Sequence, residues 1–152
     1  MNGRLFLCLT YRLFVCTAPA ISAVQCSDGG GDRVFGEQDT ITIIMNQNTS
    51  VAVNTQWNTS QTISNLNPNV GAGLGSVTTA LWVSADRVII TVLNATGVNV
   101  FQNCSQLKFR FAAAANVKDL LSRSAPSVSE STAAITSGAF GLSTTEGTLV
   151  DE

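Results

Sequence analysis

The stretch LWVSADRVIITVLNATGVNVFQNCSQLKFRF, residues 81–111, decides the fold class of this chain. Two sets of residues alternate within it, namely Val88, Ile90 and Val92 on one side and Ile89, Thr91 and Leu93 on the other. An alternation of period two is typical of a β-strand. Turn-forming residues at 84–86 and 94–97 separate this segment from its neighbours. The stretch therefore predicts consecutive antiparallel strands joined by tight turns.

Shorter segments of the same character flank this stretch. The upstream segments are 40–45, 50–57, 62–66 and 77–83, and the downstream segments are 98–101 and 107–111. Short strands at this spacing predict an all-β fold, an antiparallel β-sandwich or jelly-roll-like domain. After them, AAAANVKDLLSR at 112–123 combines good helix formers with spaced apolar residues, which predicts one short amphipathic helix.

The chain of 152 residues divides into an arm, a β domain and a second arm. Residues 1–33 form the N-terminal apolar arm and Gly-rich linker, residues 34–111 the β-sandwich domain, and residues 112–152 the short helix with a Ser/Thr/Ala-rich tail. This length fits one domain plus arms. We expect both arms to be extended, and the tail has too few large apolar residues to fold alone.

Charged residues make up only 12% of the chain, and the net charge is −2. No basic cluster is present, which argues against nucleic acid and against a membrane surface as partners. From Thr40 to Ala85 no side chain is charged. Because uncharged sheet edges pair readily with other chains, these edges are either covered in an assembly or solvated by Asn and Thr alone. Both interpretations stay open.

The residue types that catalysis needs are sparse. With no histidine, the chain lacks the commonest general base and metal ligand. Ser105 and Lys108 resemble a Ser–Lys pair but have no third group to orient them. Acids such as Asp28 and Asp86 suit turns better than paired catalytic carboxylates. The run GAGLG at 71–75 lacks the Lys and the helix of a phosphate loop. We therefore predict no enzyme, no cofactor and no metal site.

The first 23 residues allow two interpretations. A basic start at Arg4, an apolar run and small residues from Ala18 to Ala23 resemble a secretory signal peptide, but Arg12 interrupts the apolar run. The run is also too short for a transmembrane helix. The other interpretation, which we favour, is a retained apolar arm that another surface must cover. Its candidate partner-contact residues are Leu5, Phe6, Leu7, Leu13, Phe14 and Val15.

The four cysteines, Cys8, Cys16, Cys26 and Cys104, form no CxxC pair, so a zinc or iron–sulfur site is not expected. A Cys26–Cys104 bridge would require an oxidising compartment. We expect instead that all four are free thiols serving as small apolar residues.

Two further groups of residues bear on surface contacts. Asn-x-Ser/Thr sequons occur at Asn48, Asn58, Asn94 and Asn103, and in a secreted eukaryotic protein they would indicate surface glycans. Trp57 and Trp82 are additional candidate partner-contact residues, because an isolated Trp in a strand packs in a core or in an interface.

Residues 82–97 (WVSADRVIITVLNATG), followed by LKFRF at 107–111, resemble a recurrent pattern in small virion proteins of tailed phages. Upstream, ISNLNP at 63–68 and GAGL at 71–74 are similar to its strand, Asn-Pro and Ala-Gly-Leu element. The resemblance covers about half of the chain, 40–111. It implies a capsid decoration (cement) protein, a β-sandwich that is often trimeric and clamps major capsid subunits. The two arms have no counterpart in the pattern.

The predicted function is thus a structural virion protein, a capsid decoration subunit that stabilises the capsid lattice through its β domain and arms. Its partners would be the major capsid protein and copies of itself, with a trimer favoured, and its location the capsid surface. The alternative is a secreted or cell-surface β domain, adhesive or pilus-like, with signal cleavage near Ala23, a Cys26–Cys104 disulfide and glycans.

Overall fold

The computed structural model describes residues 16–31, 35–69, 71–97, 104–132, 136–138 and 140. Its strands are β1 (Ile21–Ser27), β2 (Thr40–Met45), β3 (Gln56–Trp57), β4 (Val77–Ser84), β5 (Arg87–Asn94) and β6 (Thr136–Ser137). The helical elements of the described residues are one α-helix, α1 (Thr59–Leu66), and three 3-10 turns, η1 (Gly71–Leu74), η2 (Cys104–Gln106) and η3 (Ala113–Ala115). The all-β fold class is confirmed.

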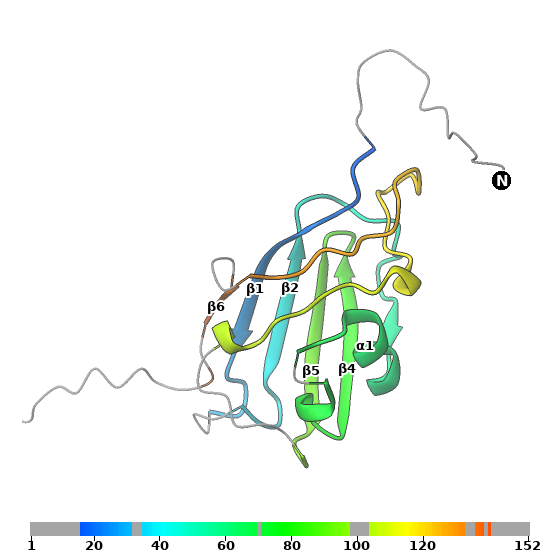
Figure 1. The fold of residues 1–152 in the computed structure, drawn as a ribbon. Helices are drawn as coiled ribbons and strands as arrows, with labels where there is room; N and C mark the ends of the chain where they lie inside the picture. The colour runs from blue at the N-terminus through cyan, green and yellow to red at the C-terminus, as the bar shows by residue number, and fades with distance from the viewer. Residues whose placement is uncertain are drawn as a thin grey trace, which may run out of the picture.

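The strands form one mostly antiparallel sheet in the order β3-β4-β5-β2-β1-β6 (Figure 1). β4 and β5 make a hairpin, β2 and β1 extend it in antiparallel register, and the short β6 pairs with β1 in parallel. The predicted strands at 40–45, 77–83 and 87–93 are confirmed. Of the segment 50–57, only β3 at its end is a strand. The predicted strand at 98–101 lies outside the described residues.

β1 lies inside the segment that we assigned to the N-terminal arm. It pairs with β2 from Ile21 to Ser27, and Val24 and Cys26 on its inner side are at most 9% exposed. The alternation is difficult to see in the sequence because small and polar residues occupy the outer positions. Removing residues 1–26 would therefore take a strand out of the sheet, which corrects the placement of the β domain's start at residue 34.

Residues 62–66, which we predicted as a strand, belong to helix α1. The helix begins with a capping box, in which Asn58 Oδ1 accepts a hydrogen bond from the Gln61 N–H at 2.9 Å and Gln61 Oε1 accepts one from the Asn58 N–H at 3.0 Å. It ends where Asn67 adopts a left-handed conformation, with φ 36°, and donates its N–H to the carbonyl of Ile63. Backbone groups at both ends are thereby satisfied, which favours a helix here.

The helix predicted at 112–123 does not form, and only η3 is helical in this segment. Asn116 and Ser122 have left-handed backbones, with φ of 52° and 58°, which an α-helix cannot accommodate. Asp119 Oδ1 accepts hydrogen bonds from the backbone N–H groups of Arg123 and Ser124 and closes a loop. A short polar side chain that captures nearby N–H groups competes with helix formation.

This loop carries a prediction about pH. Burial of Asp119 opposes its ionisation, but the N–H donors of Ser124 and Arg123 and the guanidinium of Arg123 outweigh burial and hold the pKa of Asp119 below its usual range. The carboxylate therefore stabilises the fold fully above the unfolded pKa, about 3.9, and this contribution is lost as pH falls through the lower folded pKa.

We expect Asp119→Asn to lower the free energy of unfolding by about 1–2 kcal/mol at pH 7. The loss should shrink below about pH 4, where Asp119 begins to protonate in the unfolded chain, and should vanish once the pH falls below the lower folded pKa. Urea unfolding of the wild type and the variant at pH 7 and below about pH 4 measures the loss of unfolding free energy under each condition. Glu130→Gln, at an exposed acid, is the matched control. A loss of equal size at both pH values would contradict the role of the charge.

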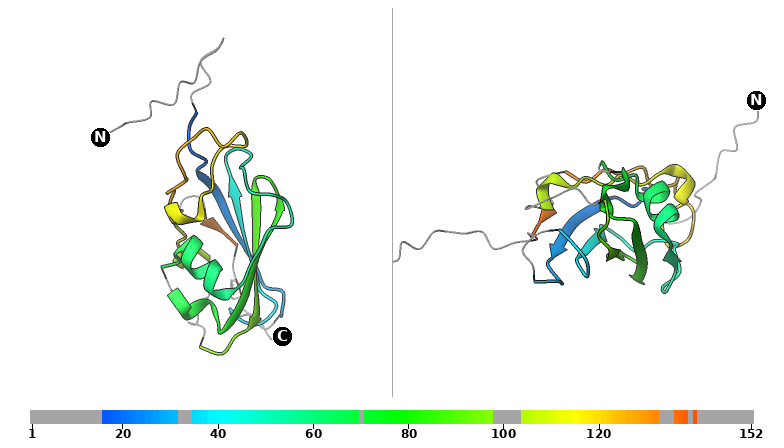
Figure 2. Two further views of the ribbon diagram at one scale, coloured as in Figure 1. Left: turned by 90° about the vertical axis from the view of Figure 1, so that its right-hand side faces the viewer. Right: turned by 90° about the horizontal axis from the view of Figure 1, so that it is seen from below.

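The sheet is covered on one side only (Figure 2). Helix α1 and the segment 104–132 lie against this inner face, where Leu107, Phe109 and Phe111 are each 1% exposed. Phe109 and Ser131 are joined by two hydrogen bonds. The Phe109 N–H donates to the Ser131 hydroxyl at 2.9 Å, and the Ser131 N–H donates to the Phe109 carbonyl at 2.8 Å. The strand predicted at 107–111 does not form. Buried and exposed residues alternate there as predicted, but they belong to an irregular covering layer. Within the described residues the second sheet of the predicted sandwich does not form.

Candidate functional site

The uncovered side of the sheet, which we call the open face, is the candidate site. It consists of the outward side chains of four strands: positions 23, 25 and 27 of β1, 40, 42 and 44 of β2, and the odd-numbered positions 77–83 of β4 and 87–93 of β5. Successive strand side chains point to opposite faces, and the intervening residues are buried under the covering layer. No described segment lies over the open face (Figure 2).

Strand register aligns these side chains in rows across the sheet. Leu81 lies opposite Ile89 in the β4–β5 pair, Ile89 lies opposite Thr42, and Thr42 lies opposite Gln25. The neighbouring row consists of threonines: Thr79, Thr91 and Thr40. β-branched and aliphatic side chains in such rows make a continuous, even surface. The open face is therefore a regular surface and not a collection of isolated residues.

Large apolar side chains on the open face remain in contact with solvent. Val77 is 43% exposed, Leu81 37%, Val83 38% and Leu93 53%. Single exposed apolar residues are ordinary on a protein surface, but a contiguous apolar group marks a contact surface. The register places Leu81, Ile89 and Val83 towards one end of the β4–β5 pair and Val77 and Leu93 at the other, with the Thr79–Thr91 pair between the two apolar groups.

Charge is distributed unevenly between the two sides of the domain. Arg87 is the single charged residue at the outward positions of the described strands. The covering segment 104–132 alone carries six charged residues: Lys108, Arg110, Lys118, Asp119, Arg123 and Glu130. Charged side chains favour water, so this distribution suits a domain that keeps its covering layer in solvent and its open face against another surface.

The two predicted tryptophan contacts are corrected by the structure. Trp57 is 7% exposed, and Trp82 is fully buried. Their rings pack edge to face with centroids 5.9 Å apart, and Trp82 also packs on Phe111 at 6.4 Å. Both residues occupy inward positions of their strands, so their side chains lie in the core and neither can contact a partner. The six predicted contacts on the N-terminal arm, from Leu5 to Val15, lie outside the described residues.

Cys26 and Cys104 form a disulfide across a sequence separation of 78 residues. The expectation of free thiols is therefore wrong for this pair. The bond joins β1 to η2, and both residues are buried at 9% and 0% exposure. Gly138 lies directly against this site, because a Cβ there would come 2.3 Å from the Cys26 carbonyl oxygen. Sequence spacing alone could not show that β1 brings Cys26 beside Cys104.

The buried carboxylate of Asp39 has a structural role, because it binds backbone N–H groups of two neighbouring loop residues. Its Oδ1 accepts the Gly29 N–H at 3.0 Å and its Oδ2 accepts the Gly36 N–H at 2.8 Å. Burial raises the pKa of Asp39 above its usual value, and these N–H donors partly offset the rise. No group of three or more His, Cys, Asp or Glu residues in the described part of the chain could hold a metal ion.

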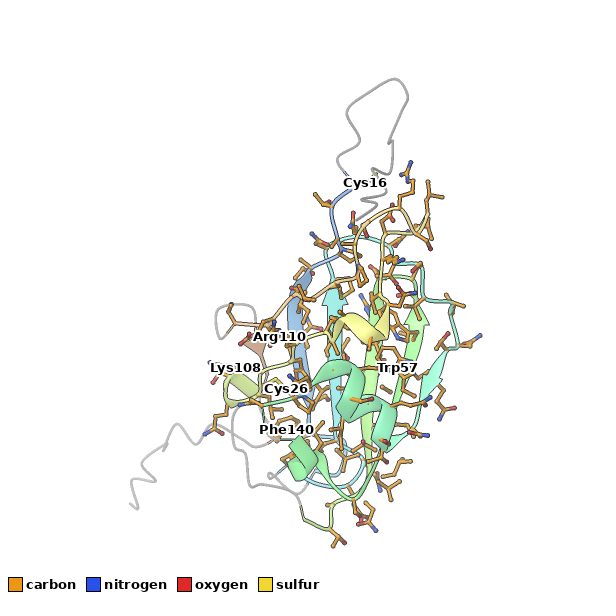
Figure 3. The ribbon with its side chains drawn as sticks, turned by 45° about the vertical axis from the view of Figure 1, so that its right-hand side comes forward. Cys16, Cys26, Trp57, Lys108, Arg110 and Phe140 are labelled. Atoms are coloured by element: carbon orange, nitrogen blue, oxygen red, sulfur yellow. A yellow bond between two sulfur atoms is a disulfide. The ribbon has the colours of Figure 1, made fainter. Side chains whose placement is uncertain are left out.

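A shallow hollow of about 190 Å³ lies on the covering layer, lined by Asn67, Asn69, Lys108, Phe109, Arg110 and Glu130. Lys108 and Arg110 project from the covering segment (Figure 3). Alternation with the buried residues of 107–111 explains their outward position. The hollow contains both signs of charge and no buried catalytic group, so we assign no chemistry to it.

Three of the four sequons are described, and two of them lie away from the outward strand positions. Asn48 is exposed in the connection between β2 and β3, and Asn58 caps α1 on the covered side. Asn94, at the end of β5, is half-buried and accepts hydrogen bonds from Ser76 and Thr96. Asn103 lies outside the described residues. Glycans at Asn48 and Asn58 would leave the open face clear, whereas Asn94 lies opposite Val77 at the end of that face.

The sequence contained the open face but did not identify it. Alternation in 87–93 divided the residues into two faces, yet both were apolar, with Ile89 and Leu93 on one and Val88 and Ile90 on the other. Which face is covered depends on where the segment 104–132 folds. Comparison with protein-family models, curated proteins and solved structures gives no match. No helix in the described residues is long and apolar enough to cross a membrane.

Proposed function

We propose that this chain is a structural domain that works outside the reducing cytosol, as a secreted or cell-surface subunit that makes protein contacts through its open face. The observation that carries the proposal is the Cys26–Cys104 disulfide. Structural disulfides persist in oxidising compartments and are rare in the cytosol. Both sulfurs belong to buried residues, and the bond ties the first strand to the covering layer.

The open face supports the interaction part of this proposal. It combines four exposed apolar residues with rows of Thr and a single charge, and no described segment covers it. The covering layer by contrast carries mixed charges and suits contact with water. The sequons at Asn48 and Asn58 lie off the open face, which agrees with secretion and with a free contact surface.

A capsid decoration subunit is the second candidate. The resemblance of residues 82–97 to phage virion proteins suggests it, and the open face, with its single charge, favours it because a subunit seated on a protein lattice needs a surface poor in charge. The match of 107–111 weakens it, since these residues belong to the covering layer and not to a sheet strand. We rank it below the secreted subunit because of the disulfide.

Alkylation and intact mass of the native protein test the compartment. We expect an alkylating agent to leave Cys26 and Cys104 unmodified unless a reductant and a denaturant are added first, because both are bonded and buried. Removal of an N-terminal segment before β1, or added glycan mass, would further support secretion. Alkylation of both residues without reductant would contradict the proposal. Fixed stoichiometry in purified virus particles would favour the decoration subunit.

A further inference from the structure

We infer that the open face binds the open face of a second copy of this chain, so that two sheets pack face to face. This inference rests on the proposed function and names the partner of its contact surface. The pair would place a sheet on each side of a shared apolar layer, with the covering layers outermost. The second sheet that the sequence predicted within one chain would then come from the partner copy.

The distribution of charge selects this partner. A surface that carries Arg87 as its single charge gives no favourable ion pairs to a strongly charged partner, and burying it against charges would leave them unpaired. The covering layer of a second copy carries charged residues such as Lys108 and Glu130 and is a poor match. The open face of a second copy has the same scarcity of charge, so the pair would bury no charged group apart from the two Arg87 side chains.

The shape of the open face agrees with this arrangement. Twisted sheets pack face to face with their strands about 30° apart and a separation of about 10 Å. Two copies have the same twist and the same rows, so a twofold axis brings Leu81 and Ile89 of one copy against the same group of the other. Exposed aliphatic side chains such as Leu93 and Val77 then fill the space between the sheets.

The size of the open face indicates a weak dimer. Four strands of about seven residues give a flat area on the order of 450 Å² per copy. A standard protein–protein interface buries about 800 Å² per partner, so this contact is smaller than a stable dimer needs. We expect an association that depends on concentration and that becomes stronger when several copies are held close together.

Sedimentation equilibrium of the full-length protein, produced through a secretory pathway, tests the inference. We expect monomer at low concentration and dimer as the concentration approaches about 1 mM. Leu81→Lys, in the middle of the open face, should keep the protein monomeric, because two desolvated ammonium groups would face each other. Thr91→Lys adds the same charge without removing an apolar contact and serves if Leu81→Lys misfolds.

Leu121→Lys is the matched control, since Leu121 is 63% exposed on the loop of the covering layer. It should dimerise as the wild type does. Wild-type protein that remains monomeric up to about 1 mM, or dimers that persist in both open-face variants, would overturn the inference. If the monomeric protein still resists alkylation of Cys26 and Cys104, the proposed compartment stands and only the partner is rejected. Free thiols at both positions would instead reject the proposed function.

Discussion

Replacing both Cys26 and Cys104 with alanine is expected to lower the free energy of unfolding by roughly 4 kcal/mol. The bond closes a long loop, with a sequence separation of 78 residues, and a cross-link of this span removes much of the conformational freedom of the unfolded chain. In the folded protein the disulfide also holds β1 in place. β1 lies next to the edge of the sheet, and the edge strand beside it is the two-residue β6. A loss of this size is a large part of the stability of an ordinary domain.

Guanidinium unfolding with and without a reductant measures this contribution. Reductant should destabilise the wild type to the level of the Cys26→Ala/Cys104→Ala variant and should leave the variant unchanged. The slope of the unfolding free energy against denaturant should rise in the variant, because the unlinked unfolded chain exposes more surface. A wild type that is indifferent to reductant under unfolding conditions would contradict the bond.

Trp82→Ala is expected to cost about 3–5 kcal/mol of stability, as large-to-small substitutions of buried aromatic residues do. The side chain is fully buried between Trp57 and Phe111. Its Nε1 has no hydrogen-bond partner among the described residues. The loss therefore comes from apolar packing and from the cavity that remains, and no neighbouring polar group loses a partner.

Thermal unfolding of Trp82→Ala, Trp82→Phe and Leu121→Ala separates a core role from a contact role. Trp82→Phe should cost less than Trp82→Ala because most of the ring volume is retained. Leu121→Ala, at a side chain that is 63% exposed, should change stability by no more than about 0.5 kcal/mol. A Trp82→Ala variant as stable as the wild type but impaired in association would restore the interpretation of Trp82 as a partner contact.

Strands in the middle of the chain were predictable because their signals are local. β2, β4 and β5 have alternating β-branched residues, and the turn at 84–86 joins the last two directly. Helix α1 could also have been predicted from the sequence, since Asn58 and Gln61 have the spacing of a capping box. The apolar residues of 62–66, taken without this cap, predicted a strand, and that prediction is wrong.

Other features depended on contacts that no local pattern records. The alanines of 112–115 favour a helix, but Asn116 and the loop around Asp119 end it after one turn. Strand β1 has few large residues and is held by β2, by β6 and by the Cys26–Cys104 bond. A residue's partners across the sheet are distant in sequence, so propensity and spacing could not identify them.

The sequence by itself determined the all-β class, the central hairpin and the scarcity of charge, because alternation and composition are properties of neighbouring residues. Only the tertiary structure decided which face of the hairpin is buried and that Cys26 meets Cys104. The physical reason is that both faces of β5 are apolar, so burial depends on where the segment 104–132 packs. That packing leaves Leu81 and Leu93 exposed and thereby creates the open face.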